Sequence, residues 1–177
     1  TIDINDLAPA MTVQEEADSG DSAVAPVTGE MGGRSKASRS AMVTKYGGTA
    51  ASEAAVGLGL IWLKNHQRRD GSWNYNHLTP NCDTTCSQPG SLTKTTTGST
   101  AMALLAYMGA GSNYADGEYQ RTVEAALNYL LYQSRAVPAG LDMAVTAEGN
   151  ARMYVQGLCT AALSEATAIN LMLLRAN

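Results

Sequence analysis

The chain has 177 residues, 45% of them hydrophobic, which is enough for one domain with its own core and too few for two full domains. The net charge of -4 is unevenly spread, because residues 1–30 carry seven acidic side chains and no Lys or Arg. The weak positive balance of the remainder, without a basic cluster, excludes a nucleic-acid-binding surface. The longest apolar stretch, residues 101–110, is about half of the ~20 residues that a membrane-spanning helix needs, so no membrane span is expected.

The chain divides into two parts by composition. Residues 1–45 are acidic at first, then rich in Gly and Ser, and short of large apolar side chains. Such a segment buries too little surface to offset its ordering entropy, so it is predicted to be a flexible arm. Residues 46–177 form the predicted helical domain. Nothing in the sequence indicates the compartment, and three cysteines fit neither a disulfide scaffold nor a four-cysteine zinc site.

The heptapeptide at residues 67–73, Gln-Arg-Arg-Asp-Gly-Ser-Trp, is typical of a helix end. It follows an uncharged run at residues 54–63, and its cations suit a helix C-terminus. Gly71 is expected to take a positive φ, which glycine adopts without a Cβ penalty. Gln67 is expected to bond to backbone groups nearby, and Trp73 to lie over the helix end with its N–H on a carbonyl.

The first helix is predicted to begin at Thr49, whose hydroxyl can cap it, with Glu53 placing negative charge in the first turn. Val56, Leu60 and Leu63 fall on one face at helical spacing. With so few charged residues, this helix is expected to be packed on most sides.

Three more helices are predicted. Residues 98–108 contain no charge, so this second helix is placed at the centre of the packing. Residues 118–134, preceded by Asp116 as a cap, form an amphipathic third helix, and residues 154–174 an almost uncharged fourth. Outer and inner helices therefore alternate. The side chains expected in the core on their spacing or apolar context are Trp62, Tyr107, Tyr129 and Cys159.

This alternation is an internal repeat. At an offset of 67 residues, Val56, Leu60, Trp62 and Leu63 of the first helix correspond to Val123, Leu127, Tyr129 and Leu130 of the third. At an offset of 59 residues, Gly98, Ala103 and Leu104 of the second helix correspond to Gly157, Ala162 and Leu163 of the fourth. The sequence therefore encodes two helical hairpins of one type. A single hairpin cannot bury its inner helix, so neighbouring hairpins are expected to stack.

Gln67, Gly71 and Trp73 spell Q-x-x-x-G-x-W, which resembles the QW motif of the terpenoid cyclase and protein prenyltransferase superfamily. From about residue 32 to 168, the chain is similar to the prenyltransferase and squalene oxidase repeat proteins of planctomycete-type bacteria. The segments that carry this resemblance are residues 47–49, 52–56, 62–63, 81–92, 104–111 and 153–154. The resemblance implies an all-α fold of αα-hairpin repeats, a partial α/α toroid, in a larger bacterial protein.

The catalytic motifs of that superfamily are missing from the sequence. Neither the D-x-D-D acid of squalene cyclases nor the D-D-x-x-D of ionising prenyl synthases is present, and no usable prenyltransferase zinc set or G-C-G-E-Q thioester occurs. The sequence therefore favours a noncatalytic helical repeat domain that acts as a scaffold or binding module. The alternative is part of a terpenoid-cyclase-like or prenyltransferase-like enzyme, a lyase or isomerase with its acid outside this chain and an isoprenoid substrate.

Two sets of candidate site residues remain. His77, Cys82 and Cys86 lie in a long loop. The three residues are candidate ligands of a zinc ion. Alternatively, Cys82 and Cys86 form a disulfide, or both are reduced cysteines without a ligand. The starts of the two inner helices are expected to form a polar rim around a ligand, made of Thr95, Thr96, Thr97, Tyr154 and Gln156. If the inner helices line a cavity, the ligand is expected to be apolar. Two hairpins leave an apolar C-terminal edge, which the remainder of a toroid or a partner chain is expected to cover.

Overall fold

The computed structural model describes residues 43, 45–78, 86–115 and 117–176. Within these ranges the chain is mostly helical, with helices α2 (Ala50–Asn65), α3 (Thr96–Gly109), α4 (Gln120–Gln133) and α5 (Arg152–Ala176). A short 3-10 helix, η3 (Gly149–Ala151), leads into α5. The four predicted helices are therefore confirmed. The arm predicted for residues 1–45 falls, apart from residues 43 and 45, outside the described residues, as does the predicted cap Asp116.

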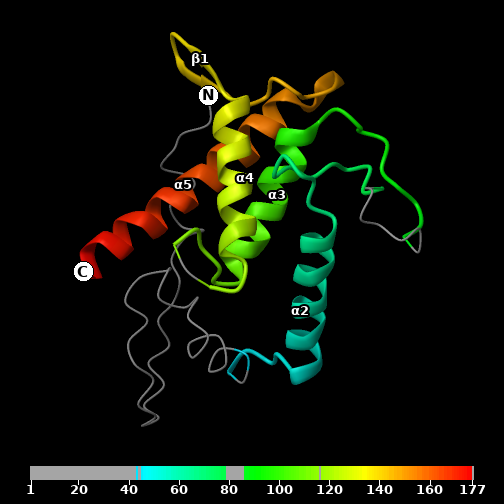
Figure 1. Cartoon of the computed structure of the whole chain (residues 1–177), viewed down its shortest axis with the longest axis vertical. Helices are drawn as coiled ribbons and strands as arrows, with labels where there is room; N and C mark the ends of the chain where they lie inside the picture. Colours follow the sequence, from blue (N-terminus) through cyan, green and yellow to red (C-terminus); the bar gives the residue numbers. More distant parts are fainter. Residues whose placement is uncertain (1–42, 44, 79–85, 116, 177) are drawn as a thin grey trace, which may run out of the picture.

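Helix α3 is the centre of the packing, as its uncharged sequence predicts. It packs mainly against α5 and α4, and much less against α2 (Figure 1). Nine of its side chains or glycines are buried, among them Leu104, Tyr107 and Met108, which are almost completely inaccessible. Other large core residues come from α4 and α5, including Val123, Leu130 and Val155, and from the connecting segments, including Trp73 and Met143.

Helix α2 begins where the sequence predicts but is packed differently. Thr49 and Ser52 form a reciprocal capping box, and Glu53 lies in the first turn. None of the residues of α2 is buried, and the helix extends away from the other three (Figure 1). The prediction that it is packed on most sides is therefore wrong, and so is the core position of Trp62, which is 40% exposed. The reason is that few of the described residues pack against α2.

Helix α5 also departs from the expected inner helix. Val155, Cys159, Ala162 and Ala166 are buried along one stripe, whereas the side chains on the opposite side are exposed. The low charge of α5 therefore does not reflect burial all round. Its buried stripe faces α3, and Cys159 lies in the core as predicted.

A small antiparallel hairpin separates α4 from α5 and is absent from the predicted elements. Strands β1 (Arg135–Val137) and β2 (Gly140–Asp142) pair with Arg135 opposite Asp142. Each strand has only three residues, which is too short for an alternating pattern to appear in the sequence. None of the helices in the described ranges is long and apolar enough to cross a membrane.

Candidate functional site

The QW stretch does cap α2 as the sequence predicts, and it also joins α2 to other helices. Gly71 has φ +87°, and the indole N–H of Trp73 donates to the carbonyl of Leu63 at 2.8 Å. Gln67 Nε2 donates both to the Gly71 carbonyl and to the Thr122 carbonyl of α4, each at 3.0 Å. A Cβ on Gly71 would lie 2.3 Å from a backbone oxygen of α4, so the motif needs glycine for close approach as well as for its backbone angle.

Trp73 is fastened to the start of α3. Its backbone N–H donates to Thr100 Oγ1 at 3.0 Å, and its carbonyl accepts from Ser99 Oγ at 2.8 Å. Asp70 Oδ1 accepts from the backbone N–H and the hydroxyl of Ser72, which is the turn-forming role that its sequence position indicates. The motif is thus a structural joint between α2, α3 and α4.

The threonines of the predicted polar rim bond to other segments of the chain. Thr95 and Thr97 are buried, and their hydroxyls are hydrogen-bonded to Glu148 and Thr146 respectively. The hydroxyl of Thr96 lies 2.6 Å from that of Tyr129. These side chains attach the start of α3 to α4 and to the segment before α5.

The two rim residues of α5 lie in different surroundings. Tyr154 is 62% exposed and none of the described pockets includes it. Gln156 accepts from the backbone N–H of Met143 at 2.8 Å and donates to the carbonyl of Leu141 at 3.0 Å. Gln156 therefore joins the start of α5 to the β hairpin, where it lines a groove.

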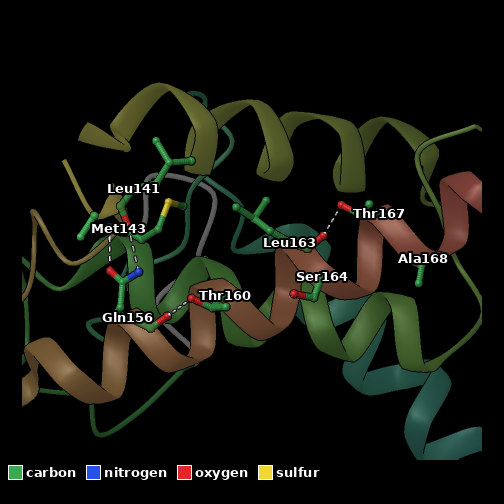
Figure 2. Close-up of a pocket in the computed structure, with 9 residues that line it drawn as sticks. Leu141, Met143, Gln156, Thr160, Leu163, Ser164, Thr167 and Ala168 are labelled. Atoms are coloured by element: carbon green, nitrogen blue, oxygen red, sulfur yellow. Dashed lines mark hydrogen bonds between the residues drawn. The ribbon is translucent and has the colours of Figure 1, made fainter. Parts of the chain in front are cut away.

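This groove runs along α5 from the β hairpin and has a volume of about 630 Å³ (Figure 2). Ala139, Leu141 and Met143 form one end of it. The remainder is a stripe of α5 side chains at helical spacing, namely Gln156, Thr160, Leu163, Ser164, Thr167 and Ala168. Most of these α5 residues are small, and small side chains on a helix surface allow another helix to approach closely.

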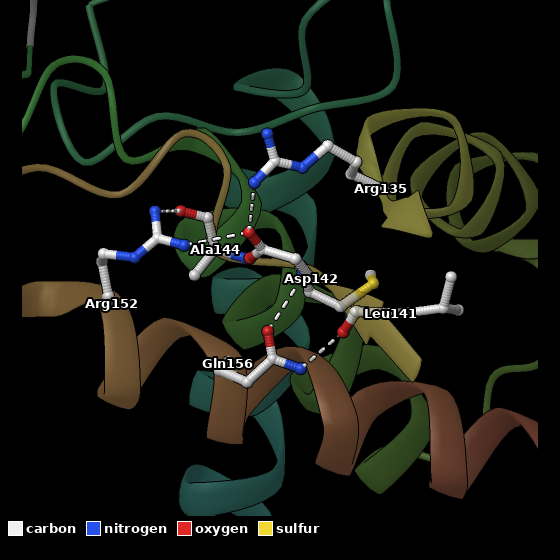
Figure 3. A network of polar contacts seen from close by, with 7 residues as sticks. Arg135, Leu141, Asp142, Ala144, Arg152 and Gln156 are labelled. Carbon is white, nitrogen blue, oxygen red and sulfur yellow. Dashed lines mark hydrogen bonds and ion pairs between the residues drawn. The ribbon is translucent and has the colours of Figure 1, made fainter. Parts of the chain in front are cut away.

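A polar network fixes the hairpin end of the groove (Figure 3). Asp142 Oδ2 accepts from Arg152 at 2.9 Å and from Arg135 at 3.1 Å, while its Oδ1 accepts from the Ala144 backbone N–H at 3.0 Å. The Ala144 hydrogen bond, followed by the two guanidinium groups, lowers the pKa of the Asp142 carboxyl. The hairpin is therefore tied to the first turn of α5.

The predicted zinc residues divide between described and undescribed parts of the chain. Cys82 lies outside the described residues, whereas His77 and Cys86 both lie near the C-terminal end of α2. Cys86 is a free thiol in the structure, and the disulfide alternative is not tested because Cys82 lies outside the described residues. Among the described residues, no group of three His, Cys, Asp or Glu side chains is placed to hold a metal ion.

The residue that the sequence reasoning missed is His66, the cap residue of α2. Its Nδ1 lies 2.7 Å from the Trp62 carbonyl and its Nε2 lies 3.4 Å from Cys86 Sγ. Since a carbonyl oxygen only accepts, Nδ1 carries the proton, and in the neutral ring Nε2 accepts from the Cys86 thiol. The indole N–H of Trp62 donates to the same sulfur at 3.3 Å. A histidine at a helix cap was the only signal in the sequence.

His77 completes this aromatic cluster. Its ring lies edge-on to the rings of Trp62 and His66, which are themselves stacked with centroids 3.9 Å apart. Nε2 of His77 is buried and, among the described residues, has no hydrogen-bond partner. A second pocket, of about 330 Å³, lies beside the cluster between α2 and α3. It is lined mainly by apolar side chains and contains no carboxylate; the lining residues are Trp62, Leu63, His66, Trp73, Asn74, Tyr75, His77, Ser99, Met102 and Ala103.

No significant match to this chain was found among protein-family models, curated proteins or solved structures.

Proposed function

We propose that this chain is a noncatalytic helical repeat domain of the α/α-toroid type that acts as a scaffold, binding further helical hairpins on two open faces. The observation that carries the proposal is a difference in burial between positions related by the internal repeat. Some positions that are buried in α4 and α3, such as Val123 and Ala101, are exposed at their predicted counterparts in α2 and α5, Val56 and Thr160.

The first open face belongs to α2, the repeat counterpart of α4. Val56 is 50% exposed, whereas its counterpart Val123 is completely buried. Trp62 is 40% exposed, and its counterpart Tyr129 only 7%. Because the sequence places the same apolar pattern at both sites, the α2 face has the residues for a helix contact that the described chain does not supply.

The second open face belongs to α5, the repeat counterpart of α3. At the offset of 59 residues, the groove stripe corresponds to Thr97, Ala101, Leu104, Leu105, Met108 and Gly109 of α3. Four of these are buried because α4 and α5 pack around α3, whereas Leu105 is half-buried and Gly109 is exposed. The stripe on α5 is therefore at the position where the next helix of a repeat would pack.

The chemistry of the groove also fits an apolar helix. The hydroxyls of Thr160 and Thr167 donate to the carbonyls of Gln156 and Leu163, four residues earlier, each at 2.8 Å (Figure 2). Since these hydroxyl hydrogens are already used, the threonines present mainly methyl groups to a partner. Small side chains also allow close approach of two helix axes. The occupant that we propose is a hairpin of the same repeat, from further repeats or from a second copy of the chain.

The test is the association of the purified chain, measured by sedimentation velocity over a range of concentrations. Wild-type protein is expected to associate through these faces, and Val56→Glu on α2 and Thr160→Arg in the groove are each expected to weaken the association. Tyr132→Glu is the matched control, because Tyr132 is 86% exposed on α4 and belongs to neither face. A chain that stays monomeric at all concentrations and does not bind an apolar fluorescent dye would contradict the proposal.

The alternative function, part of an enzyme acting on isoprenoids, is favoured by the apolar pocket between α2 and α3. Its Trp62, Trp73 and Met102 side chains suit an apolar ligand. Acid-initiated cyclisation needs a carboxylic acid, and none lines this pocket. Incubation of the protein with squalene or a prenyl diphosphate, followed by product analysis, distinguishes the two functions, since the scaffold proposal expects no product.

A further inference from the structure

We propose that Cys86 is a nucleophilic thiol, with His66 as its base, that adds to apolar electrophiles seated in the pocket between α2 and α3. Trp62 belongs both to this site and to the open α2 face, whereas Val56 and the groove on α5 do not contribute to the site. The ligand class is an α,β-unsaturated carbonyl compound with an apolar group.

The geometry follows the arrangement of a nucleophile, a base and a group that orients the base. Cys86 Sγ lies 3.4 Å from His66 Nε2, and His66 Nδ1 is held at 2.7 Å by the Trp62 carbonyl. That carbonyl fixes both the tautomer and the direction of the ring, so the lone pair of Nε2 faces the thiol. His66 is 5% exposed, so the surrounding structure restrains the ring.

Trp62 supplies the second feature of a thiol site. Its indole N–H lies 3.3 Å from Cys86 Sγ, where it can donate to the sulfur after the thiol proton has moved to His66. The thiolate then receives hydrogen bonds from the indole and from the imidazolium. Thiolate is the nucleophilic form of cysteine, and donors placed in advance favour it.

The pocket determines the class of electrophile. Both residues that bond to Cys86, Trp62 and His66, also line the pocket. Its volume of about 330 Å³ is at the lower end of the range for small-molecule sites, and its lining is mostly apolar. Cys86 itself is not a lining residue, so the fitting ligand is a soft carbon electrophile whose apolar group occupies the pocket and whose reactive carbon reaches past Trp62 and His66 to the sulfur.

The addition is balanced without an oxidant, a reductant or a leaving group. The thiol proton passes from Cys86 to His66 Nε2, and the thiolate electron pair forms a bond to the β-carbon of the electrophile. The C=C electrons move toward the α-carbon, which then takes the proton from His66. The product is a thioether on Cys86, and His66 returns to its neutral form.

The experiment measures labelling of Cys86 by N-ethylmaleimide and N-cyclohexylmaleimide, using peptide mass spectrometry of the whole chain, folded and in urea. A partly buried thiol that is only shielded reacts more slowly in the folded protein. We expect the opposite at Cys86, with folded labelling about tenfold faster than unfolded, within the range of a positioned base. Cys159, which is fully buried, should be labelled only in urea and reports in the same digest that the fold is intact.

Substitution of His66 separates the base from the helix cap. His66→Asn keeps an amide N–H where Nδ1 bonds to the Trp62 carbonyl, but removes Nε2, so Cys86 labelling should fall to about the unfolded rate while Cys159 stays protected. If that variant unfolds, Trp62→Phe keeps the ring and removes only the N–H donor, and a few-fold decrease is expected. Folded wild-type labelling no faster than unfolded, or His66→Asn labelling as fast as wild type, would overturn the proposal.

The apolar ligand class has its own test. The ratio of cyclohexyl to ethyl labelling at Cys86 should be higher in the folded chain than in urea. Met102→Trp, which narrows the pocket, should lower this ratio to the value in urea. Equal ratios in folded and unfolded wild-type protein would refute the role of the pocket, even if the thiol itself proved reactive.

Discussion

The valines at positions 56 and 123 provide the sharpest test of how the repeat is packed. They are the same residue type in two helices, at positions that the predicted repeat relates by an offset of 67 residues. Val123 is completely buried against the core in α4, whereas Val56 is 50% exposed on α2. Replacing each by alanine removes the same atoms from two environments that differ only in what covers them.

The expected costs differ severalfold. Val123→Ala removes two buried methyl groups at about 0.8 kcal/mol each and leaves a small cavity, so it should lower the free energy of unfolding by about 2–3 kcal/mol. Val56→Ala removes groups that water already reaches, and its cost should be about 0.5 kcal/mol or less. Alanine is also the better helix former, which offsets part of the loss at position 56.

Urea unfolding, monitored by circular dichroism, measures both costs. The comparison requires that the free energy of unfolding falls with urea concentration at the same slope in the two variants. The measurement should be made at low protein concentration, where self-association does not cover α2. Equal costs for Val56→Ala and Val123→Ala would show that α2 is buried in the isolated chain and would refute the open-face reasoning. At high concentration, Val56→Ala should instead weaken association.

Three further predictions concern the joints of the fold. Gly71→Ala should destabilise the chain by about 2 kcal/mol or more in the same urea assay, because the residue keeps a positive φ and its Cβ would meet the Ala125 carbonyl; an unchanged midpoint would refute this. His77→Phe should stabilise the chain by about 1 kcal/mol, because it removes a buried nitrogen that has no partner among the described residues; a loss of stability would show that Nε2 is in fact bonded. The hydrogen bond from Ala144 lowers the pKa of Asp142, so its stabilisation is complete above the ordinary value of 3.8 and disappears as the pH falls through the lowered value. Asp142→Asn should therefore weaken the acid dependence of the unfolding midpoint, and an identical pH profile would contradict this.

Local features of the fold were predictable because they depend on neighbours in the sequence. The Thr49 cap, the positive φ of Gly71 and the Trp73 N–H on a carbonyl of the preceding helix all depend on residues close together in the sequence, the most distant being Leu63 and Trp73. The central place of α3 follows from its lack of charge. The distant hydrogen-bond partners could not be predicted from the sequence, since Gln67 bonds to Thr122, which is 55 residues away.

Burial of the outermost helices was not predictable from their own sequence. An apolar pattern indicates that a face can be covered, and it does not indicate that the described chain contains the covering element. This is why α2 was expected to be packed on most sides and is not. The contact between His66 and Cys86, 20 residues apart, likewise depends on the path of the loop rather than on any motif. Cys159, by contrast, was expected in the core, and burial raises its pKa to about 11.

The attachment of α2 explains how an exposed apolar helix keeps a defined position. Its C-terminal half is held by directed hydrogen bonds, from Tyr107 Oη to the Leu60 carbonyl and from the Trp73 indole to the Leu63 carbonyl, both at 2.8 Å. Burial around Tyr107 raises the pKa of its phenol, so the hydroxyl stays protonated and remains a donor. Such hydrogen bonds fix the orientation of α2 without burying its apolar side chains. Gln67, Trp73 and Tyr107 therefore hold the C-terminal end of α2 in place. They leave the apolar face of α2 free for the hairpin that we propose to pack there.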